Sequence, residues 1–271
     1  MKTAKSQIHF ITGAASGIGA ATARAAVAAG HKVVLADINL GGARAVAAGL
    51  GPDALALALD ITDGRQWDQA LDAAWAHFGR VDVLVNNAAV VHTGYARDVS
   101  IDHHGATIQT NFMGPLTGML KALPRFKAQG AGHLVTVCSM TAFLPFPGIA
   151  SYAAAKHALR AFHHGLMLEE RHGPVAFTIV HPTATETPML EQEAQDDAVA
   201  MAFAGPAVTA ETVAEVILKA IRLRSVEIFM PPERGRVVRR VGTSPRALRA
   251  LVERNEVIGA ERQKERRARS A

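Results

Sequence analysis

Residues 12–19, Thr-Gly-Ala-Ala-Ser-Gly-Ile-Gly, follow directly on an apolar segment at 8–12 and open an Ala-rich segment that stops at Gly30. The order is strand, glycine-rich turn and helix, in which bare backbone approaches a pyrophosphate over a helix N-terminus. Glycines also precede helices in turns that bind nothing, so the turn alone is a weak signal. Its place after the first strand of an alternating pattern favours a dinucleotide site.

Apolar segments of strand length recur along the rest of the chain. Most are continuous apolar strings, which is typical of a parallel sheet covered on both faces. The stretches between them have helical periodicity, as in 65–78, 151–172 and 210–223. This alternation predicts an α/β fold: a single doubly wound, Rossmann-like domain with a seven-stranded parallel sheet and helices on both faces. The expected strands are 8–12, 32–36, 55–60, 81–86, 133–139, 175–180 and 227–230.

The composition narrows the class of protein. Of 271 residues, 49% are hydrophobic and 20% are charged, which excludes a disordered, collagenous or coiled-coil chain. The single cysteine, Cys138, cannot close an intramolecular disulfide. There is no uninterrupted apolar run long enough to span a membrane, and the N-terminal stretch is too short for a signal-peptide core. We therefore expect a cytoplasmic protein.

Two segments depart from the alternating pattern. Residues 188–206 form a long insertion after the sixth strand and predict either a mobile substrate lid or a surface helix. Residues 231–271 form a basic extension with 12 Lys+Arg and 5 Asp+Glu, against 17 and 19 for residues 1–230. A near-neutral body lacks the broad basic surface of a nucleic-acid-binding protein. We expect a catalytic domain over 1–230, then a helical extension with one apolar face made of Leu248, Leu251, Val252 and Ile258.

Carboxylates and amides stand where strands of the predicted sheet end, which is where such sheets bind ligands. Asp37 ends the second strand and is placed to accept hydrogen bonds from adenosine ribose hydroxyls. A ribose phosphate beside Asp37 would cost roughly 1 kcal/mol in water and roughly 4 kcal/mol at an effective dielectric of 20. Neither Ala15 nor Ser16 supplies a compensating cation, so the sequence favours NAD over NADP. Asp60 ends the third strand and is placed to accept a hydrogen bond from the adenine amino group, and Asn86-Asn87-Ala88-Ala89 stands at the end of the fourth strand.

Tyr152 and Lys156 open a predicted helix and share one of its faces, because they are four residues apart. Ser139 ends the fifth strand, 13 residues before Tyr152. An ammonium about 4 Å from a phenol is worth roughly 4 kcal/mol at an effective dielectric near 20, which would bring the tyrosine pKa from about 10 to near 7. A Tyr and a Lys one turn apart are commonly an ordinary helix surface. In the company of Ser139 and the glycine turn, they predict a proton-transfer site.

Two other chemistries find little support. The chain has twelve histidines, including the pairs His103-His104 and His163-His164, but none has the spacing and acidic partner of a zinc site. Ser139, His157 and an aspartate are the residue types of a hydrolase triad, but the G-x-S-x-G turn that carries the serine nucleophile is absent around Ser139. The sequence predicts neither a metal site nor a hydrolase.

Taken together, these motifs resemble the classical short-chain dehydrogenase/reductase family over about residues 8–230. The family's T-G-x-x-x-G-x-G turn is present at 12–19, its Tyr-x-x-x-Lys at 152–156, its serine at Ser139 and its helix asparagine at Asn111. The resemblance implies a nicotinamide cofactor and hydride transfer between its C4 and a carbinol carbon. The departures are Ala89 and Thr183, where the family usually has glycine, and they raise the question of whether the backbone there needs glycine.

The resemblance also implies roles for individual residues. Tyr152 is the expected acid/base, Ser139 holds the substrate oxygen, Lys156 binds the nicotinamide ribose and lowers the tyrosine pKa, and Asn111 holds a water that links Lys156 to solvent. Thr187 is expected at the nicotinamide carboxamide. The full expected cofactor site is Thr12, Gly13, Ser16, Gly17, Ile18, Gly19, Asp37, Asp60, Ile61, Asn87, Ala88, Tyr152, Lys156, Pro182 and Thr187.

The sequence thus predicts an NAD-dependent oxidoreductase that interconverts a secondary alcohol and its ketone. The expected substrate wall is mostly apolar, which favours a hydrophobic substrate; it comprises Val91, His92, Met140, Phe143, Leu144, Phe146, Leu190 and Phe203. The alternative is a nicotinamide-binding sensor or scaffold without turnover. For the extension, a solvated arm, a subunit contact and a basic helix on acidic lipid remain open; we favour a soluble homo-oligomer because helices of this family commonly pair across subunits.

Overall fold

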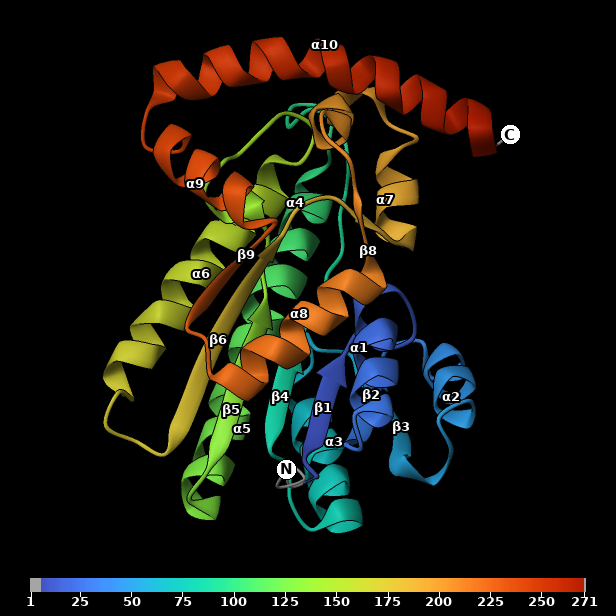
Figure 1. Cartoon of the computed structure of the whole chain (residues 1–271), viewed down its shortest axis with the longest axis vertical. Coiled ribbons are helices and arrows are strands. Elements are labelled where there is room, and N and C mark those ends of the chain that lie inside the picture. Colours follow the sequence, from blue (N-terminus) through green and yellow to red (C-terminus); the bar gives the residue numbers. More distant parts are fainter. Residues whose placement is uncertain (1–5, 271) are drawn as a thin grey trace.

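The computed structural model describes residues 6–270. Residues 1–5 of the predicted catalytic domain and residue 271 of the predicted extension lie outside the described part. Seven parallel strands form one sheet in the order β3-β2-β1-β4-β5-β6-β9 (Figure 1). This confirms the predicted doubly wound fold. The strands are β1 (Ile8–Thr12), β2 (Lys32–Asp37), β3 (Ala54–Ala58), β4 (Val83–Asn86), β5 (Gly132–Val137), β6 (Val175–Pro182) and β9 (Glu227–Met230).

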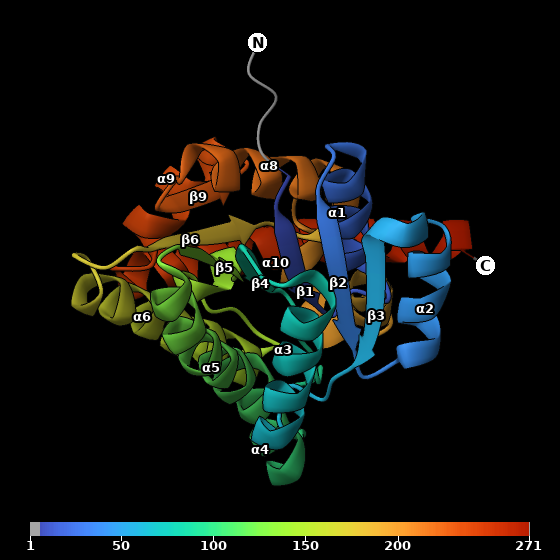
Figure 2. The same ribbon diagram turned by 90° about the horizontal axis from the view of Figure 1, so that it is seen from below.

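Helices cover both faces of the sheet (Figure 2). Successive residues of a strand point to opposite sides of the sheet, and here the residues on both sides are apolar. In β1, for example, Phe10 packs toward one helix layer and Ile11 packs toward the other. One layer consists of α3 (Gly64–Phe78), α5 (Gly114–Gln129) and α6 (Ala150–Glu169). The opposite layer consists of α1 (Gly17–Ala28), α2 (Leu40–Ala48) and α8 (Ala210–Leu223).

Five of the seven predicted strands differ at an end from the sequence prediction; β2 ends at Asp37 rather than at 36, and β6 ends at Pro182 rather than at 180. β3 ends at Ala58 and β5 at Val137, so Asp60 and Ser139 each lie two residues beyond a strand. β4 begins at Val83 rather than at 81. Buried apolar residues adjoin three of these ends: Leu59 follows β3, Cys138 follows β5 and Val81 precedes β4. Sequence hydrophobicity cannot distinguish a buried strand from the buried loop beside it.

The segment after β6 carries short elements instead of one helix. A small parallel pair, β7 (Thr185–Glu186) and β8 (Val208–Thr209), encloses α7 (Pro188–Glu193) and the 3₁₀ segment η4 (Asp197–Phe203). The basic extension forms α9 (Pro232–Val241) and α10 (Pro245–Ser270). Figure 1 shows α10 lying across the molecule at the carboxyl ends of the strands, above α7.

The apolar face of α10 differs in part from the prediction. Leu248, Leu251 and Val252 pack against a buried cluster, whereas Ile258 is exposed. Further along, Gly259 and Gln263 are the buried residues. Steps of four residues advance by about 40° around a helix, so the contact stripe moves away from Ile258. None of the helices within residues 6–270 is both long and apolar enough to cross a lipid bilayer.

Candidate active site

A cavity of about 1100 Å³ opens at the carboxyl ends of the strands. It exceeds the usual range of about 300–1000 Å³ for a small-molecule pocket, so it has room for a dinucleotide and a substrate together. Most of the residues expected at the cofactor and in catalysis line it: Gly13, Ser16, Gly17, Ile18, Asp37, Asp60, Ile61, Asn87, Ala88, Ser139, Tyr152, Lys156, Pro182 and Thr187. Thr12, Gly19 and Asn111 do not appear in its wall.

The glycine turn has the backbone that its sequence requires. Gly13 and Gly17 have φ of 65° and 52°, in the left-handed region that favours glycine. A Cβ on Gly13 would lie 2.8 Å from the Cα of Ala88, and one on Gly19 would lie 2.1 Å from the carbonyl oxygen of Gly13. Ser16 precedes α1, and its hydroxyl makes no capping bond to that helix. The turn and the positive end of α1 therefore suit a bound pyrophosphate.

Thr12 is buried behind the turn and joins two strand ends. Its Oγ1 accepts hydrogen bonds from the backbone N–H of Asn87 at 2.9 Å and of Ala88 at 3.1 Å. The Asn87 amide donates in return to the carbonyl oxygen of Thr12 at 2.9 Å. Thr12 thus fixes the distance between β1 and β4, and its hydroxyl is used within the protein. Thr12 is 1% exposed and lies outside the cavity wall, so its expected part in the cofactor site stays a prediction, and its observed contacts hold the backbone of the glycine turn.

Asp37 sits beside the glycine turn. Its Oδ2 accepts from the backbone N–H of Ala15 at 2.9 Å, and its Oδ1 accepts from Asn39 at 2.8 Å. The carboxylate is held by backbone amides and has no Lys or Arg ion-pair partner within the described chain. Asp60 lies farther along the same cavity and accepts from the backbone and hydroxyl of Thr62.

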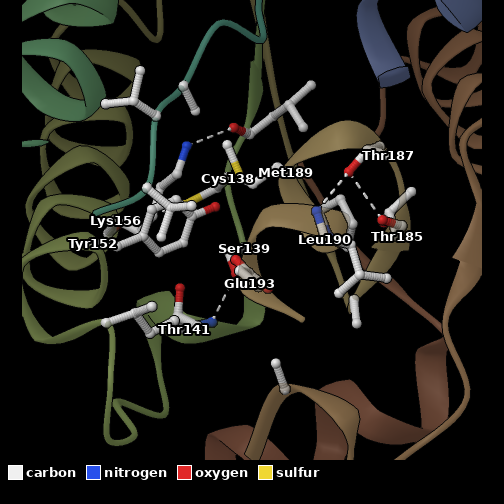
Figure 3. Close-up of a pocket in the computed structure, with 18 of the residues that line it drawn as sticks. Cys138, Ser139, Thr141, Tyr152, Lys156, Thr185, Thr187, Met189, Leu190 and Glu193 are labelled. Carbon is white, nitrogen blue, oxygen red and sulfur yellow. Dashed lines mark hydrogen bonds between the residues drawn. The ribbon is translucent and has the colours of Figure 1, made fainter. Parts of the chain in front are cut away.

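Three of the four catalytic residues suggested by the sequence, Ser139, Tyr152 and Lys156, meet in the cavity (Figure 3). Tyr152 and Lys156 come from the first turns of α6, and the Lys156 Nζ is 5.4 Å from the centroid of the Tyr152 ring. Lys156 is buried and donates to the carbonyl oxygen of Val137 at 3.3 Å. The Ser139 Oγ accepts from the backbone N–H of Thr141 at 3.1 Å, which fixes the hydroxyl at the end of β5.

The expected lowering of the phenol pKa does not occur in the protein alone. Burial raises the pKa of Tyr152, the carboxylate of Glu193 raises it further, and hydrogen bonding with Ser139 opposes both. Burial also lowers the pKa of Lys156. The sequence argument used the attraction between ammonium and phenolate and omitted the cost of taking both out of water. The neutral phenol is therefore the form that this site favours.

Asn111 lies in a π-helical turn, η2 (Gln109–Met113), between α4 (Ile101–Ile108) and α5. Its side-chain amide is buried, accepts from the backbone N–H of Val90 at 2.9 Å and donates to the Val90 carbonyl oxygen at 2.7 Å. Both ends of the amide are thus used to hold the loop after β4. The expected role of Asn111, holding a water that links Lys156 to solvent, stays a prediction.

The two departures from glycine fit without strain. In the described chain, Arg224 is the non-glycine residue with positive φ, so neither Ala89 nor Thr183 needs glycine's conformational freedom. The hydroxyl of Thr183 accepts from the Arg234 guanidinium of α9, a bond that glycine could not form. Thr187 lies against Gly17, where a Cβ would meet its methyl carbon at 3.1 Å, and its Oγ1 accepts from Leu190 at the start of α7.

The substrate side of the cavity includes most of the expected apolar residues, with two exceptions. Phe143 turns away and packs against His181 and Phe229, with ring centroids 5.0 and 5.1 Å away. Phe203 packs against Leu190 in a separate cluster. The orientation of Phe143 is set by the 3₁₀ turn of residues 140–142 that follows Ser139. No periodicity in the sequence predicts this turn.

Three residues at or beside this site carry no sequence motif that would have identified them: His181, Glu227 and Glu193. The His181 ring contacts the carbonyl oxygen of Ser139 at 2.9 Å and Glu227 at 3.0 Å. Burial alone would lower the pKa of His181, but hydrogen bonds to Cys138 and Glu227 raise it to about 9. The charged pair of His181 and Glu227 thus holds the backbone of Ser139 through the bond between the His181 ring and the Ser139 carbonyl oxygen. Within residues 6–270, no group of three or more His, Cys, Asp or Glu side chains is placed to hold a metal ion.

Comparisons with known proteins agree with this geometry. A family model described as short chain dehydrogenase matches residues 7–198. The chain is 35% identical over 192 residues to trans-4-hydroxycyclohexanecarboxylate dehydrogenase of Sinomonas cyclohexanicum, covering 68% of this chain and 74% of that one. It is 32% identical over 190 residues to 3-alpha-(or 20-beta)-hydroxysteroid dehydrogenase of Mycobacterium tuberculosis, covering 70% and 73%. A short-chain dehydrogenase/reductase from Burkholderia phymatum, solved with NAD, superposes with a TM-score of 0.81 at 27% identity and covers 88% and 94%.

Proposed function

The chain belongs to the short-chain dehydrogenase/reductase family and is an oxidoreductase of that family; on this premise we propose that it uses NAD to interconvert a hydrophobic secondary alcohol and its ketone. The observation that carries the proposal is the convergence of Ser139, Tyr152 and Lys156 in one cavity with the glycine turn. Two relatives are named for reactions of cyclic alcohols, which supports an alcohol on a ring as the substrate class.

Each site residue has a distinct part in the proposed reaction. A bound nicotinamide supplies or accepts the hydride. Tyr152 gives its phenolic proton to the substrate oxygen in ketone reduction and takes it back in alcohol oxidation. Ser139 orients that oxygen, and Lys156 holds the nicotinamide ribose. The left-handed glycines and the start of α1 hold the pyrophosphate.

The proposal is tested by turnover of a panel of hydroxysteroids, cyclic and aliphatic secondary alcohols and sugars, followed at the reduced-nicotinamide absorbance band. We expect at least one cyclic alcohol to be oxidised with NAD, and its ketone to be reduced with NADH. The alternative is a nicotinamide-binding sensor or scaffold. Tight NADH binding without turnover of any member of a broad panel would favour that alternative.

Replacing Asp37 by Ala is expected to relax the preference for NAD. The carboxylate would repel a phosphate on the adenosine ribose, and two charges a few ångströms apart near a protein surface interact by about 1–4 kcal/mol. We expect the ratio of kcat/KM for NAD to that for NADP to fall by about 10-fold to 100-fold. The matched control is Asp53→Ala, because the Asp53 carboxylate pairs with Lys32 at the amino-terminal ends of β2 and β3, whereas Asp37 lies at the carboxyl end of β2. An unchanged ratio in the Asp37 variant would contradict the cofactor assignment.

The cellular location and assembly also remain proposals. We propose that the protein is cytoplasmic, which the single cysteine supports. We also propose that it is a homo-oligomer, because helices of members of this family commonly pair across subunits. Light scattering gives the assembly state. Salt-dependent sedimentation with acidic liposomes tests whether α9 and α10 instead rest on lipid.

A further inference from the structure

One acidic residue of the cavity wall, Glu193, has no role in the reaction described above. It is the last residue of α7 and follows Met189 by four positions, so both lie on the same helix face. Met189 and Tyr152 both pack against the same buried cluster, which consists of Val91, Ile149 and Val199. Glu193, Ser139 and Tyr152 all line the same cavity (Figure 3), and the Glu193 carboxylate acts electrostatically on the phenol.

The surroundings of Glu193 are poor in groups that would stabilise a charge. The cavity wall near the catalytic residues is largely apolar, with Met140, Leu144, Phe146, Ile149, Met189 and Met201 among its members. No described residue donates a hydrogen bond to the Glu193 carboxyl group or forms an ion pair with it. Burial raises the pKa of Glu193 to about 7. A carboxyl group placed in an apolar wall without a partner costs free energy unless a ligand supplies the missing hydrogen bond.

The end of α7 is also held firmly in place. Gln263 of α10 is 1% exposed and donates from Nε2 to the carbonyl oxygens of Glu193 at 3.2 Å and Asp196 at 2.8 Å. Four residues earlier, Gly259 lets α10 approach η4 closely, since a Cβ there would lie 1.9 Å from the carbonyl oxygen of Ala200. The basic extension therefore fixes the backbone that carries Glu193, and the carboxyl group is presented to the cavity from a rigid support.

We propose that Glu193 is a substrate-recognition residue whose carboxyl group hydrogen-bonds a second hydroxyl on the substrate, so that the enzyme selects diols and hydroxy ketones over simple alcohols. The inference rests on the proposed function, because it concerns the same cavity and reaction. A neutral hydroxyl suits this site better than an anion, because a substrate carboxylate would face both Glu193 and the developing phenolate of Tyr152. Gln263 acts as a positioning residue, through the backbone of Glu193.

The test compares matched six-membered rings: cyclohexanol, the cyclohexanediols, 2-aminocyclohexanol and 4-hydroxycyclohexanecarboxylate. The readout is the ratio of kcat/KM for the best diol to that for cyclohexanol. We expect Glu193→Leu to lower this ratio by about 10-fold to 100-fold, the effect of deleting one hydrogen bond to an ionisable group. Glu193→Gln keeps a donor and an acceptor and should lower it less, while improving the turnover of the hydroxy acid.

Two further variants separate recognition from general packing. Glu191→Gln is the matched control: it lies two residues earlier on α7, its carboxylate pairs with Arg266 outside the cavity, and the ratio should stay as in the unmodified enzyme. Gln263→Leu should lower the same ratio, because it frees the end of α7. Turnover of alcohols with an unchanged ratio in Glu193→Leu overturns this inference alone, and so does a preference for the amino alcohol over every diol. Absence of turnover with every alcohol overturns the proposed function.

Discussion

Tyr152→Phe is expected to lower kcat by about 10²-fold to 10⁴-fold, the range over which a positioned acid/base group contributes to rate. The variant removes a single oxygen and keeps the ring that packs against the buried cluster of Val91, Ile149 and Val199, so the wall of the cavity is preserved. NADH affinity should change by less than about twofold, because the glycine turn and Lys156 are untouched. The measurements are steady-state turnover in both directions and a fluorescence titration with NADH.

The control for this variant is provided by the chain itself, which has only two tyrosines. Tyr95 is 45% exposed and stacks with Arg97, so Tyr95→Phe should leave turnover unchanged. Because burial raises the Tyr152 pKa, the protonated phenol that serves ketone reduction dominates near neutral pH, and alcohol oxidation should accelerate as the pH rises. A residual rate above about a tenth of the original would mean that another group moves the proton.

Local sequence was enough to predict those parts of the site whose geometry is local. The glycine turn needs φ values that only glycine adopts easily, and a spacing of four places Tyr152 and Lys156 on one face. The fold followed from the alternation of buried strands and helices, because a strand buried on both sides is apolar at nearly every position. The family resemblance then added Asn111 and the expected role of Ser139.

Long-range contacts and burial could not be predicted in this way. Glu193 meets Gln263 across 70 positions of the chain, and His181 meets Glu227 across 46. A single sequence contains no periodic pattern from which contacts between such distant residues can be predicted. The predicted direction of the Tyr152 pKa shift was wrong for the same reason. The spacing of four residues indicated a nearby cation, but it could not indicate how deeply the phenol is buried in a cavity that distant segments, including α7 and α10, help to line.

The fold is expected to lose stability on mild acidification, because three buried histidines exclude protons that the unfolded chain accepts. His9 and His163 are fully buried and His133 is 5% exposed. Burial is the main cause that lowers the pKa of His9 and His163 to about 3 and that of His133 to about 4. A folded pKa below the unfolded value of about 6.5 gives stability that is complete above pH 6.5 and is lost as the pH falls.

The size of the effect follows from proton counting. Between about pH 6.5 and 4 each of the three histidines costs about 1.4 kcal/mol per pH unit, so together they cost about 4 kcal/mol per unit. Glu193 acts in the opposite direction, because its pKa is raised to about 7, and it offsets roughly one histidine. The net loss of about 3 kcal/mol per pH unit reaches about 5–6 kcal/mol over two units. That is comparable with the entire free energy of unfolding of a typical domain.

Urea unfolding between about pH 7 and pH 5 measures this slope directly, above the range where most carboxylates titrate. His163→Gln should reduce the slope by about 1.4 kcal/mol per pH unit, because glutamine can still pair with the Thr136 hydroxyl that the ring contacts at 3.0 Å but takes up no proton. His172→Gln is the control, since His172 is exposed. Glu193→Gln should steepen the slope, because it removes the group that opposes the histidines. Equal slopes in all four proteins would contradict the burial argument, since removing a proton that only one state binds must change the pH dependence of unfolding.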